Sequence, residues 1–308
     1  MTATFVAALI PIALLIAVGV ALKRIRLLAE TFWGQAERLS YYVLLPCLFF
    51  HGLATARFDG VPVWSMGCVL FFSTLGVAAS LLSIRPWLKG SDAAFTSIFQ
   101  GSIRFNNYVG VSAAVAILGA DGVGLAALAN AIIVPTVNVL CVLVFAKYGS
   151  LGAVSVKNIT RQLLLNPLVV ACVLGILFHL TGLSLPSVIE PVIKSLGQAS
   201  LPLGLVCVGA ALGFSAAGTW IRPLCISSVI KFGLMPLATT LACLAFGLNG
   251  PAAMAALIFQ ALPTASSSYI MARQLGGDAP LMAGITAAQT LVAGLALPLA
   301  VIGLAHFL

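Results

Sequence analysis

Long apolar segments separated by short polar connections run along the whole of this sequence. An α-helix needs about 20 predominantly apolar residues to cross the hydrocarbon core of a bilayer. The sequence contains ten segments of about this length, so we predict ten membrane-spanning helices. Their expected ranges are 4–22, 37–55, 62–84, 93–118, 122–146, 162–181, 192–214, 222–247, 252–275 and 279–306.

The composition supports this interpretation and excludes an ordinary soluble protein. Hydrophobic residues make up 61% of the chain and charged residues only 7%, whereas soluble domains carry about 25% charged residues. A lipid bilayer, unlike water, can solvate that much apolar surface. The formal net charge of +8 does not indicate a nucleic-acid partner, because the basic residues lie in short runs between apolar segments and form no patch.

The basic residues also predict an orientation, because cytoplasmic connections are enriched in Lys and Arg. Two basic residues, Arg57 and Lys194, fall at one set of alternate helix boundaries. Eleven fall at the other set, which we therefore place in the cytoplasm, so that both termini lie outside. The eleven are Lys23, Arg24, Arg26, Arg38, Arg85, Lys89, Lys147, Lys157, Arg161, Arg222 and Arg273.

Short motifs recur in the two halves of the chain at an offset of 156 to 161 residues. The pairs are Ile98-Phe99-Gln100 with Ile258-Phe259-Gln260, Tyr108 with Tyr269, Gly119-Ala120-Asp121 with Gly276-Gly277-Asp278, and Leu45-Pro46 with Leu201-Pro202. Five helices per half is an odd number, so the second half must enter the membrane from the opposite side. We predict two inverted five-helix repeats, 1–146 and 162–308, joined by a cytoplasmic linker at 147–161, a common plan of secondary transporters.

The fourth and ninth segments are too polar for helices that face lipid. The fourth contains Arg104 and two adjacent asparagines, which would be costly against lipid. The ninth contains Pro263, which removes a backbone donor, followed by several hydroxyl side chains. We expect two interrupted helices near the bilayer centre, whose freed N–H groups and positive helix ends can bind an anion. The alternative is a proline kink with polar helix–helix contacts and no ligand.

These stretches supply most of the candidate substrate-binding residues, which are Arg104, Asn106, Asn107, Tyr108, Lys231, Pro263, Thr264, Ser266, Ser267 and Tyr269. Lys231 lies in the eighth segment, which contains no acid to pair with it. It can hold a carboxylate, anchor the backbone of the interrupted helices, or extend to the interface as long basic side chains do. The fork of Arg104 suits bidentate carboxylate binding.

Five further polar residues lie within the predicted spans, namely Gln100, Asn130, Asn138, Gln260 and Gln289. Asn130 and Asn138 are eight residues apart and share a helix face. Hydrogen bonding between helices is one interpretation, and contact with a coupling ion or substrate is the other. The seven cysteines contain no CxxC pair and are interpreted as buried hydrophobes. We expect no metal site and no cofactor.

Other functional classes fit less well. An intramembrane protease needs a Ser/His or paired-Asp arrangement, but no Asp lies mid-span and no GxSxG motif occurs, so we do not expect an enzyme. A channel has no need of inverted halves with matching interruptions. A non-transporting membrane receptor has no need of polar residues near the membrane centre. The channel and the receptor remain the alternatives to a transporter.

The whole chain resembles the auxin efflux carrier family. The residues that carry the resemblance are 104–110 (Arg-Phe-Asn-Asn-Tyr-Val-Gly), Leu262-Pro263-Thr264-Ala265 with Tyr269 and Ala272, Gly276-Gly277-Asp278, and Lys231 with Pro236. Asn106 matches the asparagine at which the family's helices cross, with Asn107 as the alternative. Family members often carry Pro where this chain has Ser112 and Ser267, so the first interruption rests on Asn and Gly alone.

The resemblance implies an all-α membrane fold with broken, crossing helices 4 and 9, like that of sodium/bile acid symporters or sodium/proton antiporters. Helices 1, 2, 6 and 7 would form a scaffold that makes a homodimer, and helices 3–5 and 8–10 a moving transport domain. A bacterial inner-membrane protein that carries small organic anions, malate- or malonate-like or auxin-like, is implied. Coupling to sodium, coupling to protons and uniport all remain open.

Overall fold

The computed structural model describes residues 2–55, 61–88, 90–150, 165–212, 221–265 and 267–307, and within these ranges it contains helices and no strand. The α-helices are α1 (Thr2–Arg24), α2 (Glu30–Leu39), α3 (Leu45–Ala54), α4 (Val63–Ile84), α5 (Asp92–Ile103), α6 (Asn107–Leu118), α7 (Gly122–Tyr148), α9 (Pro167–Leu180), α10 (Glu190–Ala210), α11 (Ile221–Val229), α12 (Met235–Phe246), α13 (Gly250–Gln260), α14 (Ser267–Leu275) and α15 (Ala279–Leu304). Short 3₁₀ turns are η2 (Arg85–Trp87), η3 (Gly119–Asp121) and η5 (Ala305–Phe307).

Five helical stretches in the described part of the chain are long and apolar enough to cross a membrane. They are Val63–Trp87, Gly122–Tyr148, Glu190–Ala210, Ile221–Phe246 and Ala279–Leu304. Two shorter apolar helices are Pro167–Leu180 and Gly250–Gln260. The structure is thus that of an all-helical membrane protein. The count of ten spans, their orientation and the inverted repeat stay predictions.

Two of the helical stretches contain a wider π-helical turn. The turn η1 (Ser40–Leu44) joins α2 to α3, and η4 (Ile230–Leu234) joins α11 to α12. Each turn is followed at its second residue by a proline, Pro46 or Pro236. A proline ring clashes with the carbonyl four residues earlier in a regular α-helix. The wider turn relieves that clash, and such turns are frequent at functional sites.

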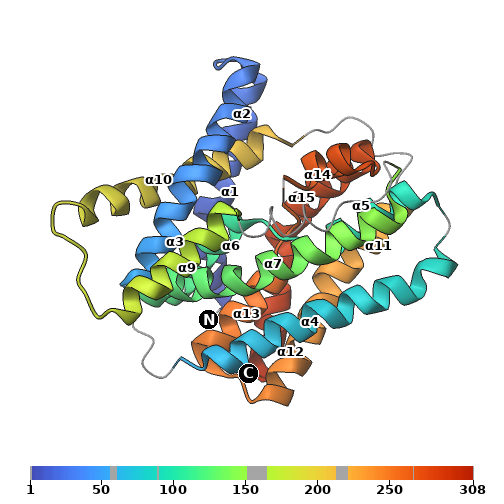
Figure 1. Ribbon diagram of the computed structural model, residues 1–308. Coiled ribbons are helices and arrows are strands. Elements are labelled where there is room, and N and C mark those ends of the chain that lie inside the picture. Colours follow the sequence, from blue (N-terminus) through green and yellow to red (C-terminus); the bar gives the residue numbers. More distant parts are fainter. Residues whose placement is uncertain are drawn as a thin grey trace. The chain divides into compact units, whose positions relative to one another are not determined.

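The contacts between residues divide the chain into two compact units. Unit 1 comprises Met1–Val61, Asn107–Ala131 and Leu164–Ala211. In it α3 packs against α9 and α10, and α1 packs along α10 (Figure 1). The contact between α1 and α10 depends on glycine, because a Cβ at Gly209 would lie 1.9 Å from the carbonyl oxygen of Ile16. Small residues permit such close helix packing in membranes.

Unit 2 comprises Pro62–Asn106, Ile132–Leu163 and Leu212–Leu308. Here α4 runs along α12, α5 packs against both α11 and α15, and α14 packs on α15 (Figure 1). The predicted scaffold helices 1 and 2 fall in unit 1, and most of helices 6 and 7 does, while unit 1 also includes Asn107–Ala131. The division into a scaffold and a transport domain stays a prediction.

The repeated Gly-x-Asp motifs form turns. Gly119 and Gly276 both have a positive φ, of 66° and 76°, a conformation that favours glycine. After Gly276, the side chain of Asp278 accepts a hydrogen bond of 3.0 Å from the N–H of Leu281 and so caps α15. The carbonyl of Gly276 accepts from the N–H of Ser150 at 3.0 Å. This motif therefore has a structural role at the start of α15.

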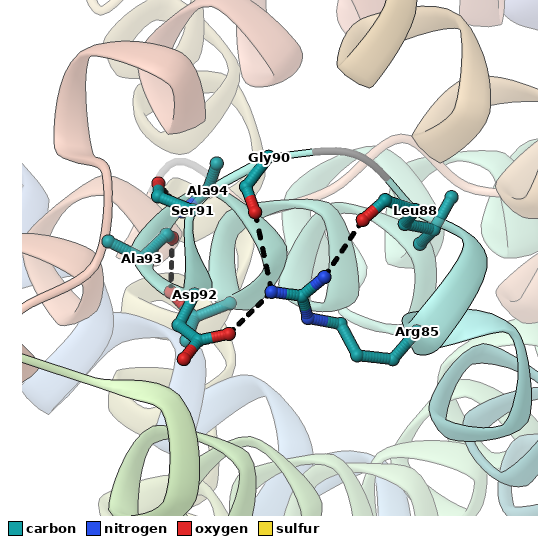
Figure 2. Close-up of polar contacts among 8 residues, drawn as sticks. Arg85, Leu88, Gly90, Ser91, Asp92, Ala93 and Ala94 are labelled. Atoms are coloured by element: carbon teal, nitrogen blue, oxygen red, sulfur yellow. Dashed lines mark hydrogen bonds and ion pairs between the residues drawn. The ribbon is translucent and has the colours of Figure 1, made fainter.

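The connection from α4 to α5 is organised by Arg85 (Figure 2). Its guanidinium donates to the carbonyl oxygens of Leu88 at 2.9 Å and Gly90 at 3.4 Å, and it pairs with the carboxylate of Asp92. It also lies over the ring of Phe95, 5.2 Å from the centroid. One basic residue at a predicted cytoplasmic boundary thus closes the turn between two helices.

Candidate functional site

The chain leaves the helical conformation at both polar stretches that the sequence singled out. α5 ends at Ile103 and α6 begins at Asn107, so residues 104–106 form the first break. Arg104 is extended there, with φ −73° and ψ 161°. Asparagine side chains compete with the helix for backbone hydrogen bonds, which favours a break at this point. α13 ends at Gln260 and α14 begins at Ser267, and residues 261–265 form the described part of the second break.

The two breaks are joined directly through their backbones. The N–H of Asn106 donates a hydrogen bond of 2.8 Å to the carbonyl of Pro263. Asn106 and Thr264 are buried. A broken helix leaves donors and acceptors without intrahelical partners, and inside a membrane these groups must be satisfied by protein or by a ligand. Each break here supplies a partner for the other.

Gln289 of α15 connects the second break to the end of α5, just before the first break. Its Oε1 accepts from the N–H of Thr264 at 3.0 Å, and its Nε2 donates to the carbonyl of Gly101 at 3.0 Å. Nε2 also lies 3.1 Å from the hydroxyl of Ser227 on α11. Gln289 is fully buried. One amide side chain therefore contacts the second break, the end of α5 and α11.

Arg104 connects the first break to α7 and α14. Its Nη1 donates to the Oδ1 of Asn138 at 3.0 Å, and its Nη2 donates to the hydroxyl of Ser267 at 3.2 Å. Nη1 also lies 3.4 Å from the sulfur of Met271. These partners are all neutral, and no ion pair in the described part of the chain includes Arg104. The half-buried guanidinium thus lies beside the first residue of α14 without an acidic partner in the described part of the chain.

Lys231 is a second basic candidate in unit 2, and unlike Arg104 it lies within a helical stretch. It belongs to the π turn η4, which packs against α5 and α15, and its side chain is 0% exposed. Among the described residues, no hydrogen-bond partner and no acidic partner of its Nζ is found. A burial this complete does not fit a side chain extended to the membrane interface.

Gln100 and Gln260, the paired glutamines before the breaks, are both buried but have different surroundings. The Nε2 of Gln260 donates to Thr74 at 2.8 Å and to Ser73 at 3.1 Å, both on α4. The Nε2 of Gln100 lies 3.9 Å from the sulfur of Met282, and its Oε1 has no partner among the described residues. Gln260 therefore anchors α13 to α4, whereas Gln100 retains an unused acceptor.

Three further candidates, Asn107, Tyr108 and Asn130, belong to unit 1. Asn107 is the first residue of α6, and Tyr108 is buried against α10, where a Cβ at Gly204 would lie 2.1 Å from its ring. Asn130 donates to the carbonyl of Ala126 in its own helix at 2.9 Å. Asn130 and Asn138 thus fall in different units.

Two candidates in the second polar stretch, Ser266 and Tyr269, are not among the buried residues described at the breaks. Ser266 lies outside the described residues. Tyr269 on α14 is 38% exposed, unlike the buried Thr264. The structure therefore brings together Arg104, Asn106, Pro263, Thr264 and Ser267 at the breaks, with Asn138 and Gln289 as their direct partners.

Sequence reasoning did not single out several partners in this cluster. Ser227 contacts Gln289 and also lies 3.4 Å from the carbonyl of Ile98. Ser268 lies 3.3 Å from the hydroxyl of Thr264. The sequence contained one clue to Ser227. It precedes Lys231 by four residues and so lies one helical turn away on the same face.

The arrangement provides hydrogen-bond donors and positive charge and contains no acidic side chain among its named members. In the described part of the chain, no group of three or more His, Cys, Asp or Glu side chains could hold a metal. Such a cluster can bind a negatively charged or hydrogen-bond-accepting ligand by contacts that need no covalent chemistry.

Comparison with known proteins identifies the family. A family model described as membrane transport protein matches residues 4–301, nearly the whole chain. No curated protein matches the sequence. The model is that of the auxin efflux carrier family, which the motifs at the two breaks and around Lys231 had indicated. The chain is therefore an integral membrane protein that belongs to the membrane transport protein family.

Proposed function

We propose that this protein is a secondary transporter that moves small organic anions by alternating access, with the anion held at the two breaks. The observation that supports the proposal is that two helix breaks occur together with two basic residues, Arg104 and Lys231. Neither of these residues has an acidic partner in the described part of the chain. A cation inside a membrane costs at least about 2.5 kcal/mol on insertion scales. A bound anion offsets that energy.

The position of Arg104 strengthens this argument. Its guanidinium donates to Ser267, the first residue of α14, and therefore lies beside the positive end of a helix dipole. A cation at this end is unfavourable unless a negative charge accompanies it. A carboxylate beside Arg104 would interact favourably with both the guanidinium and the first turn of α14.

The chemical class of substrate follows from the family resemblance and from these donors. We expect carboxylates that are malate-like, malonate-like or auxin-like. Sodium, protons or the membrane potential alone would drive the movement. We place the protein in the inner membrane of a bacterium as a homodimer with both termini outside, formed through helices 1, 2, 6 and 7.

The proposal is tested by binding to the purified protein. Its thermal unfolding is measured against a panel of small mono- and dicarboxylates, each with sodium and with potassium as the control cation. We expect at least one carboxylate to raise the unfolding temperature in a saturable way. A sodium-dependent shift would indicate sodium coupling. If no carboxylate raises the unfolding temperature while cationic or neutral solutes do, the proposed substrate class is contradicted.

A further inference from the structure

The amide of Gln289 satisfies one backbone group of the second break and one at the end of α5, just before the first break. Thr264 presents an N–H, which is a donor, and Gly101 presents a carbonyl oxygen, which is an acceptor. A primary amide offers an acceptor at one end and donors at the other. The neighbours therefore fix the orientation of the side chain, with Oε1 toward Thr264 and Nε2 toward Gly101.

The backbone around this contact leaves little room for adjustment. A Cβ at Gly101 would lie 2.4 Å from the hydroxyl of Ser227 and 2.6 Å from the Cγ2 of Ile285, so α5, α11 and α15 meet closely here. In the second break, the carbonyl of Pro263 binds Asn106 while the N–H of Thr264 binds Gln289. Pro263 and Thr264, two consecutive residues of the second break, thus bond to two different parts of the structure, the first break and α15.

We propose that Gln289 is a positioning residue for the anion: its amide fixes the separation of the two breaks, so that their remaining donors and Arg104 converge on one carboxylate. This inference rests on the proposed function and assigns a role within the same site. Gln289 acts through Thr264 and Gly101 and needs no contact with the anion. Without the amide, both groups lose a buried hydrogen bond in a place where water cannot replace it.

The decisive variant is Gln289→Glu, which keeps the shape of the side chain. A protonated carboxyl group still accepts from Thr264 and donates to Gly101, whereas an ionised carboxylate has no donor for the Gly101 carbonyl. Carboxylate binding is measured from pH 5 to pH 9 by thermal shift. We expect the variant to bind like the wild type at the acidic end and to lose about tenfold or more in affinity at the alkaline end.

Two controls accompany this variant. Gln289→Met removes the hydrogen bonds to Thr264, Gly101 and Ser227 at similar volume, and we expect its affinity to be reduced at every pH. Thr290→Val changes the neighbouring position of α15, where the hydroxyl donates to the carbonyl of Thr286 in the same helix, and should bind like the wild type. Wild-type affinity of Gln289→Met at every pH, or a Gln289→Glu profile that matches Gln289→Met at all pH values, would overturn the positioning role.

Hydrogen exchange of the protein without substrate provides a second measurement, which also applies if Gln289→Glu does not fold. We expect amide exchange in the segment 261–265 to be faster in Gln289→Met than in Thr290→Val at the same pH. Equal exchange would show that the contact to Thr264 is not formed and would overturn the inference. Faster exchange in a protein that binds no carboxylate would instead contradict the proposed function, and with it the link between Gln289 and the anion.

Discussion

The backbone N–H of Asn106 and the carbonyl of Pro263, 157 residues apart in the sequence, form a hydrogen bond of 2.8 Å that joins the two helix breaks of unit 2. This contact uses only backbone atoms. The side chains of Asn106 and Thr264 take no part in it. A substitution that shortens either side chain therefore leaves this backbone bond in place, although Thr264→Ala also removes the contact with the hydroxyl of Ser268.

We expect Asn106→Ala and Thr264→Ala to weaken carboxylate binding by about tenfold each, because each removes a hydrogen-bonding side chain from the buried breaks. Binding is measured by thermal shift or by isothermal titration calorimetry. Thr240→Ala is the control, since its buried hydroxyl bonds only within α12, to Pro236. Wild-type affinity in both test variants would place the substrate elsewhere.

Gly101 should not tolerate a side chain. Its Cβ would meet Ser227 and Ile285 at 2.4 Å and 2.6 Å, so Gly101→Ala should lower the free energy of unfolding by about 1–3 kcal/mol. Gly76→Ala in α4 is the matched control, because nothing lies within 4 Å of its Cβ. There the helix propensity of Ala should stabilise the protein by up to about 1 kcal/mol. Thermal unfolding in detergent compares the two, and equal behaviour would contradict the packing described around Gln289.

Removing the charge of Lys231 should separate function from stability. We expect Lys231→Met to reduce anion transport strongly while the unfolding temperature without substrate stays the same or rises, because a buried charge without a partner is removed. Lys194→Met, at an exposed position of α10, is the control for a change of net charge. If Lys231→Met unfolds at a much lower temperature yet keeps full stabilisation by the carboxylate, the charge has a structural role and the anion is bound by amides and helix ends.

The turn at Arg85 should matter for stability and not for substrate binding. Arg85→Gln loses the pair with Asp92 and the bonds to the Leu88 and Gly90 carbonyls, and we expect a loss of about 1 kcal/mol in unfolding free energy. Arg222→Gln, at an exposed position of α11, serves as the comparison. Substrate affinity in Arg85→Gln should equal that of the wild type, and a clear loss of affinity would show that this turn contributes to the site.

The predicted orientation is tested by reporter fusions at Lys157 and after Leu308. Eleven of the boundary basic residues place the 147–161 linker in the cytoplasm and the C-terminus outside. A cytoplasmic reporter should be active at the first position and inactive at the second. Cytoplasmic activity after Leu308 would disprove the ten-helix count or its orientation.

The positions of both breaks could be inferred from the sequence because local chemistry determines them. Pro263 cannot donate to a helix, and Asn106 and Asn107 compete with one, whatever surrounds them. The hydrogen-bond partners of the residues at the breaks depend on tertiary structure. Nothing in the sequence spacing relates Gln289 to Gly101 and Thr264. The π turn around Lys231 was also not predicted, although Pro236 supplied a physical reason for it.

Tyr108 and Tyr269 show the limit of reasoning from repeated motifs. Both follow a break and were expected at the site. Tyr108 packs into unit 1, because the absent side chain of Gly204 makes room for its ring, whereas Tyr269 is partly exposed on α14. Equivalent positions in a sequence repeat thus have different surroundings, which only the packing of each helix decides.

The central claim, that this chain carries organic anions, is tested most directly by counterflow in proteoliposomes. Vesicles that contain purified protein are loaded with an unlabelled carboxylate that stabilises it, then diluted into a trace of the labelled compound. A carrier should accumulate the label transiently, with saturable dependence on the internal concentration, and Lys231→Met should abolish the effect. Label that equilibrates without transient accumulation would indicate a channel, and no protein-dependent entry of any carboxylate would contradict anion transport.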